Sequence, residues 1–106
     1  MQIFLDVDYL GHNIRVENKW NKCSLIINGE VVDYSNAIFA IKVTLRGNIA
    51  REYKQIVFQY KWTKLYLWAN DEQILMIDLV TGEAIVSDEG QVTVNDFYGL
   101  SKGWYD

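Results

Sequence analysis

Residues 14–33 read IRVENKWNKCSLIINGEVVD, and residues 56–75 read IVFQYKWTKLYLWANDEQIL. The two stretches align without a gap as an internal repeat. Seven of the twenty aligned pairs are identical: Ile14/Ile56, Lys19/Lys61, Trp20/Trp62, Lys22/Lys64, Leu25/Leu67, Asn28/Asn70 and Glu30/Glu72. Each copy holds an extended run, a tip with tryptophan, a second extended run and a turn that begins with asparagine. The repeat predicts two equivalent hairpins, 14–33 and 56–75, and describes how the chain folds rather than what it does.

Alternation of apolar and polar residues predicts β-strands along most of the chain. In residues 38–46, IFAIKVTLR, one face is apolar and consists of Phe39, Ile41, Val43 and Leu45. A period of two places alternate side chains on opposite faces of a sheet, so this segment is expected to be a half-buried strand. Asn28-Gly29 favours a type I′ hairpin turn, because both central residues of that turn need positive φ. Asn70-Asp71 is a weaker form of the same signal.

The alternation and the turn signals together predict the fold. The expected strands are 2–8, 13–19, 23–28, 30–35, 37–46, 53–61, 64–69, 72–79, 83–87 and 91–95. They predict an all-β fold, a single antiparallel β-sandwich or flattened barrel of about nine strands, with residues 1–106 as one domain. Each repeated hairpin would bury its apolar face against the other. A short helical turn is expected within 95–103.

Composition and charge restrict the class of protein. Half of the 106 residues are hydrophobic and 14% are aromatic, so the chain is expected to fold rather than stay disordered. No apolar run reaches the roughly 18 residues that span a bilayer, and MQIFLDVDYL lacks the basic start of a signal peptide. We therefore expect a cytoplasmic protein without a membrane partner. Residues 71–106 carry one basic and eight acidic side chains, which argues against nucleic acid as a partner.

Residues with catalytic or metal-binding chemistry are few. The chain has one histidine, His12, and one cysteine, Cys23, too few for a zinc site and insufficient for an intrachain disulfide. Cys23 aligns with Leu65 and is expected to be a small buried side chain. Asp6 and Asp8 share a strand face and could form a carboxylate pair as in glycosidases, although an exposed polar face explains them more simply. We predict no enzyme activity, no catalytic residue, no metal and no cofactor.

One stretch resembles a known family. Gly11-His12-Asn13-Ile14-Arg15-Val16-Glu17-Asn18, followed by Leu25-Ile26-Ile27-Asn28-Gly29-Glu30, looks like the pattern H-x-I-x-[FV]-x-[HN] and L-x-V-[DN]-G-[KE]. This pattern is similar to that of the Fas apoptotic inhibitory molecule family and of small uncharacterised bacterial β proteins. The resemblance implies an antiparallel β-sandwich without a known catalytic site. His12 has no counterpart in the second copy, where Lys54 stands, and no functional residue is carried over.

The remaining candidates are aromatic. The alternation that turns Leu65 and Leu67 into the core points Tyr66 and Trp68 outward, and exposed Tyr and Trp are typical of binding surfaces. The predicted binding residues are Lys64, Tyr66, Trp68 and Trp104. Three interpretations stay open: the tail 97–105 covers these aromatic side chains, a protein or a second copy covers them, or they form a platform for a small ligand.

The tryptophans of the two tips form a separate prediction. Trp20 and Trp62 share the alternation of the core residues that precede them, so each is expected to fold over one end of the core as a lid. Loss of such a buried ring should cost roughly 3–5 kcal/mol.

The function that these observations favour is a non-catalytic protein-binding module. An immunity-type or inhibitor protein of bacterial or phage origin fits this description, with an unidentified protein partner or self-association. The alternative is a small lipid or small-ligand carrier that uses the interior of a flattened barrel, although ligand-holding barrels are usually larger.

Overall fold

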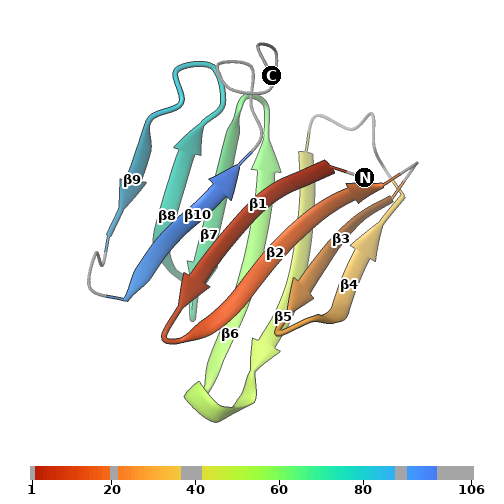
Figure 1. Cartoon of the computed structure of the whole chain (residues 1–106), viewed down its shortest axis with the longest axis vertical. Helices are drawn as coiled ribbons and strands as arrows, with labels where there is room; N and C mark the ends of the chain where they lie inside the picture. Colours follow the sequence, from red (N-terminus) through yellow and green to blue (C-terminus); the bar gives the residue numbers. More distant parts are fainter. Residues whose placement is uncertain (1, 20–21, 37–41, 88–90, 98–106) are drawn as a thin grey trace.

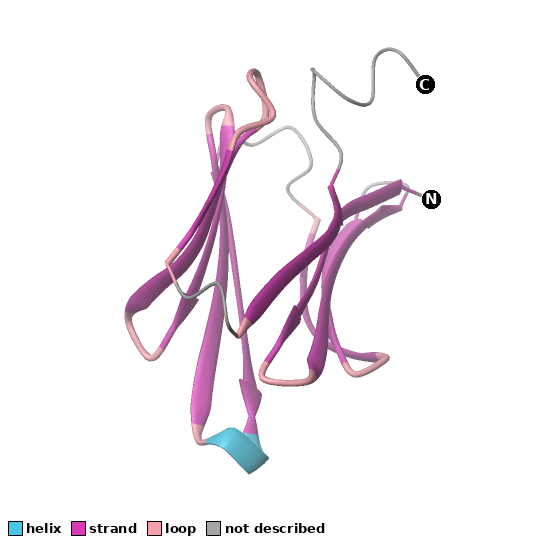
Figure 2. Ribbon diagram, turned by 60° about the vertical axis from the view of Figure 1, so that its left-hand side comes forward, coloured by secondary structure: helices cyan, strands magenta, loops and turns pink. Residues whose placement is uncertain are grey.

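A computed structural model describes residues 2–19, 22–36, 42–87 and 91–97 (Figure 1). These residues form two antiparallel sheets of five strands, with the orders β10-β1-β2-β3-β4 in the first sheet and β5-β6-β7-β8-β9 in the second. Figure 2 shows the sheets as the two layers of a sandwich. The first sheet contains β1 (Gln2–Tyr9), β2 (His12–Lys19), β3 (Lys22–Ile27), β4 (Glu30–Ser35) and β10 (Val92–Phe97). The second contains β5 (Lys42–Ile49), β6 (Lys54–Lys61), β7 (Lys64–Ala69), β8 (Glu72–Asp78) and β9 (Ala84–Val86), with a 3₁₀ turn η1 (Ala50–Glu52) between β5 and β6.

The core lies between the sheets and is made by the alternate apolar residues of the inner strands. Burial alternates residue by residue along β2, β3, β6 and β7. The largest fully buried side chains are Phe58, Leu5, Ile14, Leu25, Leu45, Ile56, Leu65, Leu67, Leu75, Ile77, Val7 and Val16. Each such side chain stabilises the fold by roughly 1.5–3 kcal/mol relative to exposure. The predicted all-β sandwich is confirmed, and the described residues form ten strands in two separate sheets that do not close into a barrel.

The strand limits differ from the predicted ones mainly around β5. Residues 37–41 lie outside the described residues, and β5 continues through Gly47 to Ile49, where a turn was expected. A Cβ atom on Gly47 would lie 2.5 Å from Cγ2 of Val32, so glycine permits the close approach of β4 to β5. Within the predicted range 95–103 for a short helical turn, residues up to Phe97 belong to β10, and the remainder lies outside the described residues. The short η1 turn was not predicted.

Each copy of the repeat forms the same three strands, β2-β3-β4 or β6-β7-β8, in a sheet of its own. Val32 of β4 has no partner residue on β3, so the strand contains a one-residue bulge there. Ile74 of β8 forms the same kind of bulge against β7. These two residues are aligned in the repeat. The shared β-bulge shows that the copies agree in strand register and not only in sequence.

The two identical asparagines make the same hydrogen bond in both copies. Asn28 Oδ1 accepts from the backbone N–H of Asn13 at 3.0 Å, and Asn70 Oδ1 accepts from that of Gln55 at 2.7 Å. Asn28 and Asn70 have φ values of 51° and 49°, the left-handed conformation that asparagine tolerates better than most residues. The type I′ prediction for these turns agrees with positive φ at both central residues of each.

Asn70→Ala is expected to lower the free energy of unfolding by about 1–3 kcal/mol, because alanine loses the bond to Gln55 N–H and disfavours positive φ. Asn70→Gly keeps the backbone conformation, so it should cost only about 1 kcal/mol. Urea unfolding of both variants measures the difference. If both variants lose the same unfolding free energy, the left-handed backbone at position 70 does not contribute to the difference. If neither variant loses any, the hydrogen bond of the Asn70 side chain does not stabilise the fold.

Candidate functional site

The outer face of the second sheet carries the predicted binding residues Tyr66 and Trp68. The strand registers arrange its outward side chains in rows that run across the strands. The rows are Arg46–Val57–Trp68–Gln73, then Thr44–Gln59–Tyr66–Met76–Ile85, then Lys42–Lys61–Lys64–Asp78. We call these side chains the outer face of the second sheet.

Two aromatic rings lie at the centre of this face. Tyr66 and Trp68 stack with ring centroids 6.4 Å apart and planes inclined by 28°. Both are half-buried, whereas Leu65 and Leu67 between and beside them are buried in the core, as the alternation predicts. A shallow hollow of about 390 Å³ adjoins Trp68 and is lined by Lys42, Thr44, Arg46, Gln55, Val57, Gln59, Trp68 and Asp71. Trp68, one member of the aromatic pair, thus borders a hollow with largely polar side chains.

Apolar side chains extend the aromatic pair toward the edge strand β9. Met76 lies opposite Tyr66 in the register, and Ile85 lies opposite Met76 with 46% of its surface exposed. Val57 lies opposite Trp68. We call these five residues the apolar stripe. Sequence reasoning missed Val57, Met76 and Ile85, because their alignment depends on registers between strands and on the bulge at Ile74.

The two outer faces of the sandwich differ in how their charges are paired. On the first sheet, Arg15 lies 4.0 Å from Asp6 and 3.6 Å from Glu17, and the Asn13 amide donates to Asp6 at 2.8 Å and to Asp8 at 3.1 Å. On the second sheet, within the described residues, the side chains of Lys42, Arg46, Lys61 and Lys64 make no ion pair and no hydrogen bond. Four cationic side chains without a partner among the described residues therefore lie together on the aromatic side of the molecule.

The residues considered for catalysis are engaged in structural contacts. Asp6 and Asp8 share the Asn13 amide as a donor, and hydrogen bonds from Asn13 and Asn95 lower the pKa of the Asp8 carboxyl. A carboxyl with a lowered pKa is poorly suited to act as a general acid at neutral pH. Burial raises the pKa of the Cys23 thiol to about 11, so the thiol is neutral and a weak nucleophile.

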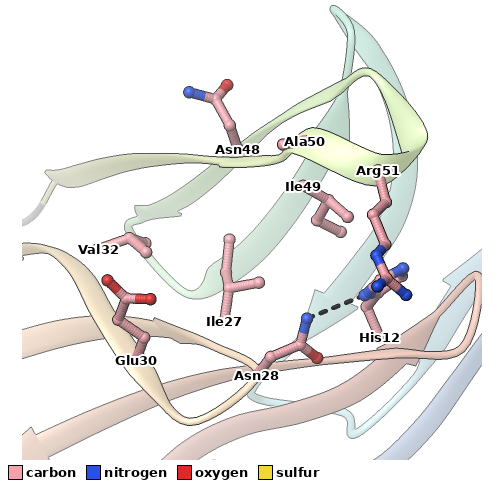
Figure 3. A pocket seen from close by; sticks show the side chains of 9 residues that line it. All are labelled: His12, Ile27, Asn28, Glu30, Val32, Asn48, Ile49, Ala50 and Arg51. Carbon is pink, nitrogen blue, oxygen red and sulfur yellow. Dashed lines mark hydrogen bonds between the residues drawn. The ribbon is translucent and has the colours of Figure 1, made fainter.

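His12 lies beside a second hollow, of about 280 Å³, at one end of the sandwich (Figure 3). The side-chain oxygen of Asn28 accepts a hydrogen bond from the backbone N–H of Asn13. The side-chain nitrogen of Asn28 therefore faces His12 and donates to its Nδ1 at 2.9 Å. His12 Nε2 lies 3.3 Å from Glu52 Oε1. Both ring nitrogens thus link the β3–β4 turn to η1. The hollow is lined by His12, Ile27, Asn28, Glu30, Val32, Asn48, Ile49, Ala50 and Arg51, without a serine or cysteine nucleophile.

The tip between β6 and β7 corrects the predicted lid. Trp62 is 62% exposed and therefore does not cover the core. Lys61 pairs with Lys64, so Trp62 is the first of two turn residues, with a φ of 57°. Strand alternation fails there because the chain reverses direction, and the side chain points to solvent. Trp20 and Trp104 lie outside the described residues.

Two further kinds of feature, a metal-binding cluster and a membrane-spanning helix, are absent from the described ranges. They contain no cluster of three or more His, Cys, Asp or Glu side chains that could hold a metal ion. In the same ranges, no helix is long and apolar enough to cross a membrane.

The protein is an antiparallel β-sandwich with two different outer faces. Polar side chains of the first sheet bond to one another, whereas the second sheet presents an aromatic pair beside cations without a partner among the described residues. Comparison of the chain with protein-family models, curated proteins and solved structures gives no match. The similarity of residues 11–30 to the Fas apoptotic inhibitory molecule family stays a prediction from the motif.

Proposed function

We propose that this protein is a non-catalytic protein-binding module and that its binding surface is the outer face of the second sheet. The observation that carries the proposal is the apolar stripe of Val57, Tyr66, Trp68, Met76 and Ile85 across a face that has no other layer against it among the described residues. Aromatic side chains, methionine and arginine are the residues enriched in protein interfaces, and aromatic anchors carry much of their binding energy.

Comparison of the copies supports a use for this face beyond folding. Tyr66 and Trp68 align with Ser24 and Ile26, which occupy the same outward positions on the first sheet. Core residues are similar in both copies because both must pack the same sandwich. The outward positions are free of that requirement, so the two added aromatic rings are more readily explained by a partner. Aromatic rings provide a large contact area at a small entropic cost.

An immunity-type or inhibitor protein of cytoplasmic location is the role that we propose for such a module. A small β-sandwich with a filled core is a rigid support for a flat binding face, and rigidity reduces the entropy lost on binding. The partner would be another protein or a second copy of this chain. No observation favours the carrier alternative, since core side chains fill the space between the sheets.

The double substitution Tyr66→Ser with Trp68→Thr tests the proposal. Both side chains are on the outer face, so we expect the variant to fold with the strand content of the parent chain. We expect it to lose concentration-dependent association in sedimentation, or to lose the proteins captured by the parent chain. The matched control is Ser24→Thr with Ile26→Thr at the aligned positions of the first sheet, which should change neither. Unchanged sedimentation and unchanged capture in the folded double variant would refute the proposal.

A further inference from the structure

Three lysines lie next to one another in one row of the outer face of the second sheet. Lys42 is paired with Lys61 across β5 and β6, and Lys61 is paired with Lys64 across β6 and β7. Neighbouring strands are about 4.7–4.9 Å apart, and like charges directly opposite each other destabilise a sheet. We call these residues the lysine row. Its arrangement opposes folding, and among the described residues no carboxylate forms an ion pair with it.

The acidic residue at the end of the lysine row makes no ion pair with its neighbour Lys64. Asp78 lies opposite Lys64, but its Oδ1 accepts from the backbone N–H groups of Val80 at 2.9 Å and Thr81 at 3.3 Å. Two cations of the first sheet do have partners. Lys22, which aligns with Lys64, lies 4.1 Å from the ring centre of Tyr34, and Arg15 faces two carboxylates. Lys19, opposite Lys22 on the first sheet, also makes no ion pair among the described residues, so what distinguishes the second sheet is a row of three lysines beside the apolar stripe.

Apolar and cationic groups are interleaved on the face. The lysine row adjoins Tyr66. Lys42 and Arg46, both on β5, line the hollow beside Trp68. A ligand that covers both features must combine carboxylates or other anions with apolar groups. The outer face of the first sheet of a second copy is a poor match, because its carboxylates Asp6, Asp8 and Glu17 are already bonded to Asn13 or Arg15. Stacking one face on the opposite face of the next copy would also produce an open-ended chain rather than a closed dimer.

We infer that the partner of this face is an acidic segment of a different protein, with apolar side chains that contact the apolar stripe and carboxylates that bind the lysine row. This inference rests on the proposed function and specifies its partner. Contacts between exposed charges mainly accelerate association and add specificity, and they weaken as salt screens them.

The test uses a short synthetic peptide in which glutamate alternates with leucine as the probe, titrated against the full chain. We expect saturable binding that weakens roughly tenfold between low and physiological salt. Lys42→Gln with Lys61→Gln and Lys64→Gln should weaken it by a similar factor and remove the salt dependence. This triple variant removes like-charge repulsion, so it should be at least as stable as the parent chain. The matched control is Lys19→Gln with Lys22→Gln at the aligned positions of the first copy, which should bind normally.

Several results would overturn the inference. Binding of the glutamate–leucine peptide that is absent, insensitive to salt or unchanged in the triple variant would do so. Tighter binding of heparin or of poly(dT) than of the peptide would assign the face to another class of polyanion. Loss of association in the Tyr66→Ser, Trp68→Thr variant, without any change in the triple lysine variant, would retain the proposed function and refute only the acidic partner.

Discussion

Replacement of Phe58 by alanine is expected to lower the free energy of unfolding by about 3–5 kcal/mol. Phe58 is the largest fully buried side chain, and it lies on β6 between Leu45 and Leu67 of the neighbouring strands. The ring of Phe4 reaches it from the first sheet, with centroids 6.4 Å apart at 61°. Removal of the ring therefore leaves a cavity at the contact between the sheets, where the surrounding strands have little freedom to close it.

Trp62→Ala is the matched comparison, since it also removes an aromatic ring from the second copy. Trp62 is 62% exposed, so the loss should be below about 1 kcal/mol, in contrast to the loss expected for a lid over the core. Urea unfolding measures both losses, as long as the dependence of the unfolding free energy on urea concentration is the same in the variants and the parent chain. A loss for Trp62→Ala as large as that for Phe58→Ala would contradict the exposed position of the tryptophan at the hairpin tip.

Asp33→Leu is expected to convert a protected sheet edge into a site of self-association. Asp33 Oδ1 accepts from the N–H of Tyr34 at 2.9 Å, and its Oδ2 accepts from the N–H of Arg46 on β5 at 2.8 Å. One carboxylate thus occupies backbone donors on β4 and β5, the end strands of the two sheets. A charged side chain that points inward at an edge is a common means of preventing strand addition.

The second copy shows what happens at this edge without the carboxylate. Leu75 of β8 aligns with Asp33, and there β9 adds to the sheet through the pairs Leu75–Val86, Met76–Ile85 and Ile77–Ala84. The β4 edge also exposes Val31, Val32 and Tyr34, by 53%, 38% and 54%. Once Asp33 is leucine, β4 should accept an antiparallel strand from another molecule in the way that β8 accepts β9.

Sedimentation of Asp33→Leu over a range of concentrations tests this expectation, and larger species should be more abundant than in the parent chain at the same concentration. Asp33→Asn keeps one acceptor oxygen and is the graded control, with an intermediate effect. A leucine variant with the sedimentation and the unfolding midpoint of the parent chain would mean that the bulge at Val32 alone protects the edge.

The sequence predicted the local features of this protein well, because they depend on neighbours along the chain. Alternation placed most strands to within a few residues and oriented Tyr66 and Trp68 outward, and Asn28-Gly29 marked its turn. Features that depend on distant segments escaped prediction. Gly47 was expected in a turn but lies in β5, since its role is to leave room for Val32 of the other sheet. The lysine row depends on the register between β5 and β6, which alternation alone does not determine.

The distribution of the repeat between the sheets bears on how the chain folds. Hydrogen bonds between β1, β2, β3 and β4, and between β5, β6, β7 and β8, join strands that follow one another in sequence, so each four-strand meander forms by closing short loops. The β1–β10 pairing spans most of the chain and joins the last strand to the first sheet. Neither meander can bury Leu25 or Leu67 without the other, so stability arises only when the two halves dock. We therefore expect the rate-limiting step of folding to be the association of two loosely formed sheets within one molecule, with unfolding that is cooperative across both copies.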